Sequence, residues 1–82
     1  MVASAQIAIY PLRQERLTPS VEAVLQALRG HGLEIQSGPI STYVVGEVDS
    51  IFVALREAFV EAAATGHVVM TITVSNACPV LD

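Results

Sequence analysis

The sequence contains no lysine, and its four positively charged side chains, all arginines, face eight carboxylates. A protein that binds nucleic acid through phosphates needs a basic face, so we expect no nucleic-acid partner. A single cysteine excludes an internal disulfide. That cysteine and two isolated histidines do not form a zinc-binding pattern, and we expect no metal and no cofactor.

Long hydrophobic runs and processing signals are also missing. No apolar stretch reaches the roughly 20 residues that span a bilayer, so we expect no membrane partner. The first residues lack a basic segment followed by an apolar one, so we expect no signal peptide. An unpaired thiol is typical of a reducing compartment, which predicts a cytoplasmic protein.

What is present is a small, apolar chain. Its 82 residues predict one domain, residues 1–82, because two cores cannot be built from so few. Charged residues make up 15% of the chain, below the about 25% of an ordinary domain. Some apolar area must therefore face outward, and without disulfide or metal the common remaining support is self-association. We expect a homodimer or homotetramer that associates through an open sheet face or sheet edges.

Hydrophobic periodicity predicts six elements. Alternation with a period of two predicts strands, and apolar residues at three- and four-residue spacing predict helices. Thr18 followed by Pro19 is typical of a helix start, and Asp49 is a predicted N-cap. Pro11 is expected to end the first strand. The predicted strands cover residues 2–10, 33–37, 40–48 and 68–75, and the predicted helices cover residues 19–29 and 49–65.

The order of these elements, strand–helix–strand–strand–helix–strand, predicts an α+β fold of ferredoxin-like βαββαβ type. Right-handed crossovers place both helices on one face of a four-stranded antiparallel sheet. The expected spatial order of the strands is four, one, three, two. Inward-facing strand residues and a helical stripe of Phe52, Leu55, Phe59 and Ala62 are predicted to form the core.

The face of the sheet without helices has a mixed chemistry. Hydroxyls, the Gln6 amide, the Glu47 carboxylate, Tyr10 and Tyr43 lie among small aliphatic groups. This mixture suits a subunit interface with a small polar site embedded in it. Alternatively, the face is exposed to water, with threonines present for their strand propensity. Glu47 could be hydrated near the strand end. Tyr10 and Tyr43 could serve only as packing in a subunit interface. Thr42, which is predicted to face inward, could satisfy local backbone groups.

The sequence lacks the catalytic patterns known for folds of this type. Arg13 follows the first strand, as in acylphosphatases, but residues 11–16 lack the glycine-rich cradle and the third strand lacks an asparagine. Cys78 has no identifiable base within reach. Metal-chaperone and RNA-binding versions of the fold need paired cysteines or basic charge, which are missing here. We therefore expect no enzyme.

Three segments together resemble the YkoF-like thiamine-binding family. They are AQIAIYPL at residues 5–12, ISTYVVGEVDSIFVAL at residues 40–55 and HVVMTITVSNACP at residues 67–79. With the intervening helix, the resemblance spans nearly the whole chain. It implies a ferredoxin-like fold, assembly through sheet faces or edges, and binding of thiamine or its hydroxymethylpyrimidine moiety. Some members carry two such repeats in one chain, so two subunits of this single-repeat chain would supply what the tandem form holds internally.

The resemblance and the open face together predict a ligand site. The matching positions are Tyr10, Ser41, Thr42, Gly46 and Ser75, with Cys78 in the tail. The leading hypothesis is non-catalytic binding of thiamine or hydroxymethylpyrimidine by a homo-oligomer. The alternatives are a structural or regulatory oligomer with another small ligand and, third, an enzyme. The predicted ligand-binding residues are Gln6, Tyr10, Ser41, Thr42, Tyr43, Glu47, Thr73 and Ser75.

Overall fold

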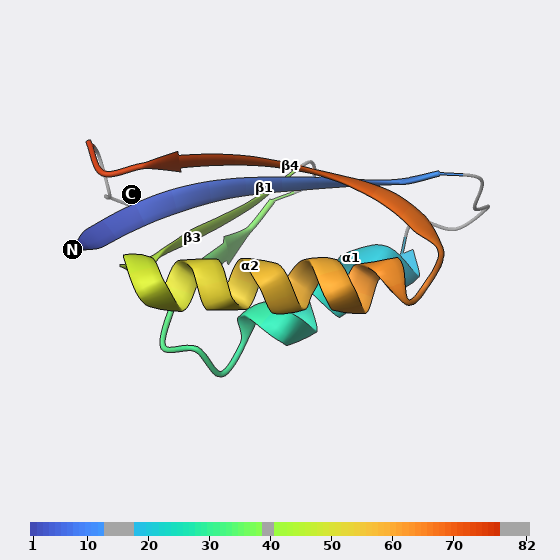
Figure 1. Ribbon diagram of the computed structural model, residues 1–82. Helices are drawn as coiled ribbons and strands as arrows, with labels where there is room; N and C mark the ends of the chain where they lie inside the picture. Colours follow the sequence, from blue (N-terminus) through green and yellow to red (C-terminus); the bar gives the residue numbers. More distant parts are fainter. Residues whose placement is uncertain (13–17, 39–40, 78–82) are drawn as a thin grey trace.

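Two helices cover one side of a four-stranded sheet (Figure 1). This computed structural model describes residues 1–12, 18–38 and 41–77. The predicted order of strands and helices is confirmed. The elements are β1 (Val2–Leu12), α1 (Thr18–Leu28), β2 (Glu34–Ser37), β3 (Thr42–Glu47), α2 (Val48–Ala63) and β4 (His67–Ser75).

The sheet has the predicted topology. Its strands lie in the order β2-β3-β1-β4, and each neighbouring pair is antiparallel. The ferredoxin-like assignment is therefore confirmed. Gly30, at a φ of 89°, and Gly66, at a φ of 140°, follow the two helices, where glycine adopts positive φ without a steric penalty. Neither helix of the described part of the chain is long and apolar enough to cross a membrane.

The core lies between the sheet and the helices. Ala3, Ala5 and Ile7 of β1 and Val44 of β3 are buried there, as the period-two pattern predicts. Small side chains on α2 let the helix backbone approach the sheet closely. The buried residues of α2 are Ile51, Ala54, Leu55, Ala58 and Ala62.

The predicted stripe on α2 was wrong for both phenylalanines. Phe52 is 55% exposed and Phe59 is 46% exposed, whereas Ile51 and Ala58, one position earlier, are fully buried. Both sets have helical spacing, so periodicity alone does not choose between them. The rotation of α2 is decided by close contact with the sheet, which small alanines permit and phenylalanines would prevent.

The end of β1 also differs from the prediction. Pro11 does not end the strand, because β1 continues to Leu12 and pairs Pro11 with Val68. Among the described residues, the β1–β3 ladder runs as far as Ile7 and Thr42. Within that part of the chain, β1 beyond Ile7 pairs with β4 alone, and a proline without an N–H donor is tolerated where one side of a strand is unpaired.

Asp49 is not the N-cap of α2. The helix begins at Val48, and Glu47 stands at the N-cap position without a side-chain capping bond. The Val48 N–H, at the first turn of the helix, donates to the Met1 carbonyl at 3.0 Å. This bond satisfies one of the backbone donors that have no partner within the helix. Asp49 lies in the first turn, where a carboxylate favours the positive end of the helix dipole.

Candidate functional site

One polar row crosses the open face of the sheet. The strand registers pair Gln36 with Tyr43, Tyr43 with Gln6, and Gln6 with Thr73. Directly paired residues of neighbouring strands point to the same face, so these four side chains lie side by side. The row contains two amides, a phenol and a hydroxyl. It therefore presents hydrogen-bond donors and acceptors with no formal charge.

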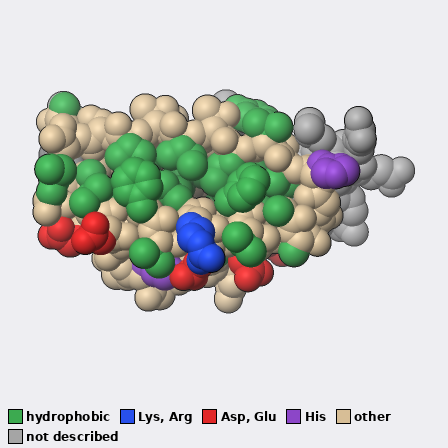
Figure 2. Space-filling view, in the orientation of Figure 1, with side chains coloured by type: hydrophobic (Ala, Val, Ile, Leu, Met, Phe, Trp, Pro, Cys, Tyr) green, Lys and Arg blue, Asp and Glu red, His purple; other side chains and the backbone are tan. Residues whose placement is uncertain are grey.

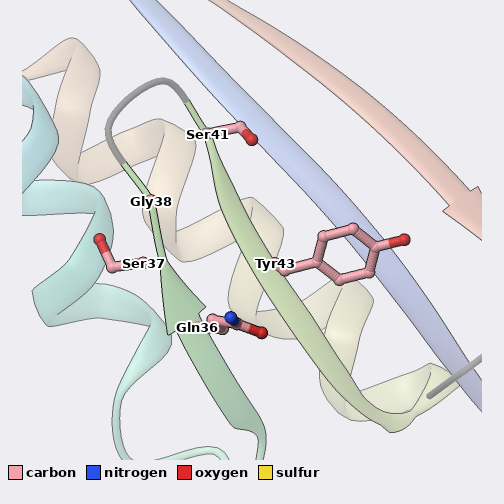
Figure 3. A pocket seen from close by; sticks show the side chains of 5 residues that line it. All are labelled: Gln36, Ser37, Gly38, Ser41 and Tyr43. Atoms are coloured by element: carbon pink, nitrogen blue, oxygen red, sulfur yellow. The ribbon is translucent and has the colours of Figure 1, made fainter. Parts of the chain in front are cut away.

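A shallow pocket of about 200 Å³ lies at the β2 end of this row, lined by Gln36, Ser37, Gly38, Ser41 and Tyr43. Figure 3 shows the Tyr43 ring lying over β1, with the Gln36 side chain on its other side. Ser37 points away from Tyr43 in the same view, consistent with its pairing with the inward-facing Thr42. The polar groups of the pocket are thus the Gln36 amide, the Ser41 hydroxyl, the Tyr43 phenol and backbone.

Two hydrogen bonds hold the pocket together. The Gln6 amide Nε2 donates to Ser41 Oγ at 3.1 Å and ties β1 to the segment before β3. The Gly38 N–H donates to the Ser41 carbonyl at 2.9 Å and closes the connection between β2 and β3. A Cβ at Gly38 would lie 3.1 Å from that carbonyl, so this position favours glycine. The Gln6 carbonyl oxygen can still accept from a ligand while its amide nitrogen donates to Ser41.

The structure brings together four of the eight predicted ligand residues. Gln6, Ser41 and Tyr43 meet at the pocket, and Thr73 continues their row onto β4. Ser75 is in the next row, where its hydroxyl accepts from the Ala77 N–H at 3.0 Å. Tyr10 lies four residues beyond Gln6 on the same face, about 13 Å along the strand.

Thr42 and Glu47 are separated from the pocket. Thr42 points into the helix-covered face and is 7% exposed, as predicted for an inward-facing residue. Glu47 lies at the end of β3, about 13 Å along the strand from Tyr43. Its carboxylate pairs with the Met1 amino group at 2.9 Å. Cys78 and Arg13 lie outside the described residues.

Sequence reasoning missed the contribution of β2. Gln36 and Gly38 line the pocket, and Glu34, paired with Val45, lies on the same face one row away. The alternation of Glu34 and Gln36 with Leu33 and Ile35 was the available signal. Glu34 is about 7 Å from Gln36 along β2, and it adds a carboxylate beside an otherwise neutral pocket.

Other polar features of the described chain are less suited to a ligand. A hollow of about 320 Å³ is lined by Glu22, Leu25, Gln26 and Arg29, all from or directly after the single helix α1. His31 Nε2 lies 3.0 Å from Glu57 Oε1 and links the end of α1 to α2. Within residues 1–12, 18–38 and 41–77, no cluster of side chains could hold a metal ion. The row on the open face is therefore the candidate site.

Comparison with known proteins identifies the family. The sequence profile of the YKOF-related family matches residues 2–80. The chain belongs to the YKOF-related family. No curated protein sequence matches the chain significantly.

Solved structures similar to this YKOF-related chain share its fold. A hypothetical protein from Methanocaldococcus jannaschii has a TM-score of 0.83 at 19% identity, covering 92% of this chain and 79% of the other. A Streptococcus pneumoniae protein has a TM-score of 0.83 at 23% identity, covering 92% of this chain and 86% of the other. A Thermotoga maritima protein described as a candidate thiamine biosynthesis/salvage protein has a TM-score of 0.79 at 18% identity. The match covers 92% of this chain and 83% of the other. At these identities the likeness establishes the fold.

Proposed function

We propose that this chain binds thiamine or its hydroxymethylpyrimidine moiety at the open-face pocket, as a homo-oligomer and without turnover. The observation that carries the proposal is the neutral polar row of Gln36, Tyr43 and Gln6 beside a pocket of about 200 Å³. Membership of the YKOF-related family and the description of the Thermotoga maritima neighbour support a thiamine-related role.

The chemistry of the row matches an aminopyrimidine. This ring carries an amino donor and ring-nitrogen acceptors on its edge, and a flat apolar face. Gln36 and Gln6 each offer a carbonyl acceptor and an amide donor, while Ser41 offers a hydroxyl that can donate or accept. The Tyr43 ring, half-buried and lying over β1, supplies a flat surface for stacking.

The size of the pocket favours the pyrimidine part of the ligand. Sites that enclose a drug-sized molecule usually have about 300–1,000 Å³, and this pocket has about 200 Å³. One ring fits such a space, and the thiazolium of intact thiamine would extend beyond it. Among the residues that the structure describes, Glu34, one row away on β2, is the nearest carboxylate on that face and is placed to attract the thiazolium cation.

The lining residues support binding rather than catalysis. Amides, hydroxyls and a phenol are present, and general acid–base chemistry near pH 7 usually uses groups that titrate near that pH. The pocket is also open, and a covering surface from a second subunit would exclude water from the ligand. This need is one reason for proposing a homo-oligomer.

The test is calorimetric titration of the purified protein with hydroxymethylpyrimidine, thiamine and, as a fragment control, the hydroxyethylthiazole moiety. We expect saturable binding of the first two and none of the thiazole alone. Tyr43→Ala should weaken binding by about two- to tenfold, since loss of aromatic stacking costs about 0.5–1.5 kcal/mol. Tyr10→Ala is the matched control, because it makes the same change on the same face outside the pocket.

Equal effects of the two tyrosine variants would place the site elsewhere on the face. If neither compound binds at millimolar concentration, the thiamine-type proposal fails. The better function would then be the second candidate, a structural or regulatory oligomer with another small ligand. The exposed apolar side chains on α2 and β4 favour that candidate.

A further inference from the structure

One hydrogen bond at the pocket joins the side chains of two separate segments. Gln6 of β1 and Ser41, just before β3, are 35 residues apart in the sequence, and the Gln6 amide nitrogen Nε2 donates to Ser41 Oγ at 3.1 Å. Ser41 lines the pocket, and Gln6 lies beside Tyr43 because the two residues are directly paired. The bonded pair therefore stands next to the flat surface that the Tyr43 ring offers (Figure 3).

This bond leaves one acceptor and one donor of the pair unused. In the described part of the chain, neither the Gln6 carbonyl oxygen Oε1 nor the Ser41 hydroxyl hydrogen has a further hydrogen-bond partner. A serine hydroxyl can accept from Gln6 and still donate its own hydrogen. If both groups reversed, the amide nitrogen would be the unused donor and Ser41 Oγ the unused acceptor. In either arrangement the pair offers one donor beside one acceptor.

Gln36 is not oriented in this way. It lines the pocket from the other side of Tyr43. Within the residues that the structure describes, its side chain has no hydrogen bond that would fix the amide. A free amide can turn to present either its oxygen or its nitrogen. Gln36 can therefore suit a ligand donor or a ligand acceptor, whereas Gln6 and Ser41 together require both.

Charged side chains are not placed to recognise a ligand at this pair. Figure 2 shows that the acidic and basic side chains visible in that view lie along and below α2, on the helix side of the strands. The Glu34 carboxylate belongs to β2, and β3 lies between that strand and Gln6 on β1. Near Gln6 and Ser41, recognition therefore depends on the order of hydrogen-bond donors and acceptors along the edge of the ligand.

We propose that Gln6 recognises the exocyclic amino group of the pyrimidine and that Ser41 positions the Gln6 amide for this contact. The inference rests on the proposed function and narrows its ligand to heterocycles with an amidine edge, in which an amino group adjoins a ring nitrogen. In the arrangement that the structure shows, the amino group donates to Gln6 Oε1 and the Ser41 hydroxyl donates to the ring nitrogen. Each of the four polar groups then has a partner.

These contacts form a closed ring of hydrogen bonds. The ligand amino group donates to Gln6, Gln6 donates to Ser41, and Ser41 donates to the ligand ring nitrogen. Hydrogen bonds linked in this way polarise and strengthen one another. A ligand without the amino donor breaks the ring and leaves Gln6 Oε1 facing a group that cannot donate, which costs affinity.

The ligand test compares two pyrimidines of nearly the same shape. Hydroxymethylpyrimidine carries the amino group, and its analogue carries a methyl group in that place, which keeps the size and the aromatic face but removes the donor. In calorimetric titrations of the wild-type protein, the methyl analogue should bind about two- to tenfold more weakly, the contribution of one hydrogen bond. Equal affinities of the two compounds would overturn the proposal.

Gln6→Met is the decisive variant, and Gln36→Met is its matched control. Both glutamines are exposed residues, and methionine keeps the length of the side chain without the amide. Gln6→Met should bring the affinity ratio of the two pyrimidines close to one, chiefly by weakening binding of the amino compound. Gln36→Met should keep the wild-type ratio even if both compounds bind more weakly. Equal changes of the ratio in the two variants would contradict recognition by Gln6.

Gln6→Glu tests the acceptor directly. A carboxylate accepts hydrogen bonds at both oxygens, so this variant should keep the preference for the amino compound that Gln6→Met loses. Loss of the preference in both variants would show that the contact depends on the amide nitrogen, and it would overturn the role assigned to Oε1.

The role of Ser41 is tested by the same affinity ratio, which a purely structural contact would not change. In Ser41→Ala the Gln6 amide is free to turn and to donate to the ring nitrogen of either compound, so the ratio should fall toward one. Circular dichroism checks that the variant is folded. Ser41→Thr keeps the hydroxyl and should keep the wild-type ratio. Equal weakening of both compounds by Ser41→Ala would overturn the positioning role.

The outcomes separate this inference from the proposed function. If hydroxymethylpyrimidine binds with no preference over the methyl analogue, recognition by Gln6 is rejected and the proposed function stands. If neither pyrimidine binds at millimolar concentration, the proposed function fails, and this inference fails with it.

Discussion

At the scale of single residues, the side of the strand decides what a side chain can do. Thr42 and Tyr43 are adjacent in β3, but Thr42 lies in the core and Tyr43 faces the pocket, because successive strand residues point to opposite faces. Thr42 is therefore too deep to meet a ligand at the pocket directly. Gly46 lies two residues after the buried Val44 and therefore faces the helix-covered side of the sheet as well.

Gly46→Ala should destabilise the protein by about 1–2 kcal/mol. A Cβ at this position would collide with the Leu33 side chain, which packs against the core. Overpacking costs about 1–3 kcal/mol, and the lower backbone entropy of alanine in the unfolded chain offsets part of it. Urea unfolding of the variant measures the loss.

The double-mutant cycle with Leu33→Ala supplies the control. With the Leu33 side chain removed, the same Gly46→Ala change should be neutral or slightly stabilising. Equal losses in both backgrounds would show that contact with Leu33 is not the cause.

At the scale of elements, α2 has two apolar sides with different tasks. One side, which includes Ile51, Leu55 and Ala58, is buried against the sheet. The other side carries Phe52 and Phe59, each about half-exposed. A helix with so wide an apolar surface is consistent with two sets of neighbours, one within the chain and one outside it.

Leu55→Ala and Phe59→Ala should therefore have different consequences. Leu55 is 5% exposed, so its truncation should cost about 2–5 kcal/mol through lost burial and a cavity. Phe59→Ala should cost less in the folding of a single chain, although phenylalanine is larger, and should mainly weaken the proposed homo-oligomer. Denaturant unfolding together with sedimentation separates the two effects. A larger folding loss for Phe59→Ala in a monomeric background would contradict the exposure of this side of α2.

At the scale of the whole molecule, the proposed assembly would add to the stability of a small domain. A domain of this size buries only about 60% of its unfolded surface and is marginal alone. A partner that binds the folded chain raises its apparent stability in proportion to the logarithm of concentration. The pocket face and the exposed apolar side chains of α2 and β4 are both places where such a partner would act.

The melting temperature should consequently rise with protein concentration, by about 3–5 °C for each tenfold increase. Scanning calorimetry over a hundredfold concentration range gives the slope. A wild-type melting temperature that is independent of concentration would mean that the chain folds and functions as a monomer.

Local patterns in the sequence were sufficient for the fold. Alternation located the strands, three- and four-residue spacing located the helices, and the order of the elements predicted the strand order that the sheet shows. These features depend on neighbours close in the chain, where side-chain direction follows directly from backbone geometry. The inward direction of Thr42 and Gly46 was predictable for the same reason.

The tertiary structure decided which residues meet. The strand registers bring Gln6, Tyr43 and Gln36 into one row and leave Glu47 and Tyr10 about 13 Å away along their strands. Packing against the sheet sets the rotation of α2 and turns Phe59 outward. Register and rotation depend on contacts between segments far apart in sequence. Periodicity within one segment assigns residues to faces, but it contains no information about which neighbours those faces meet.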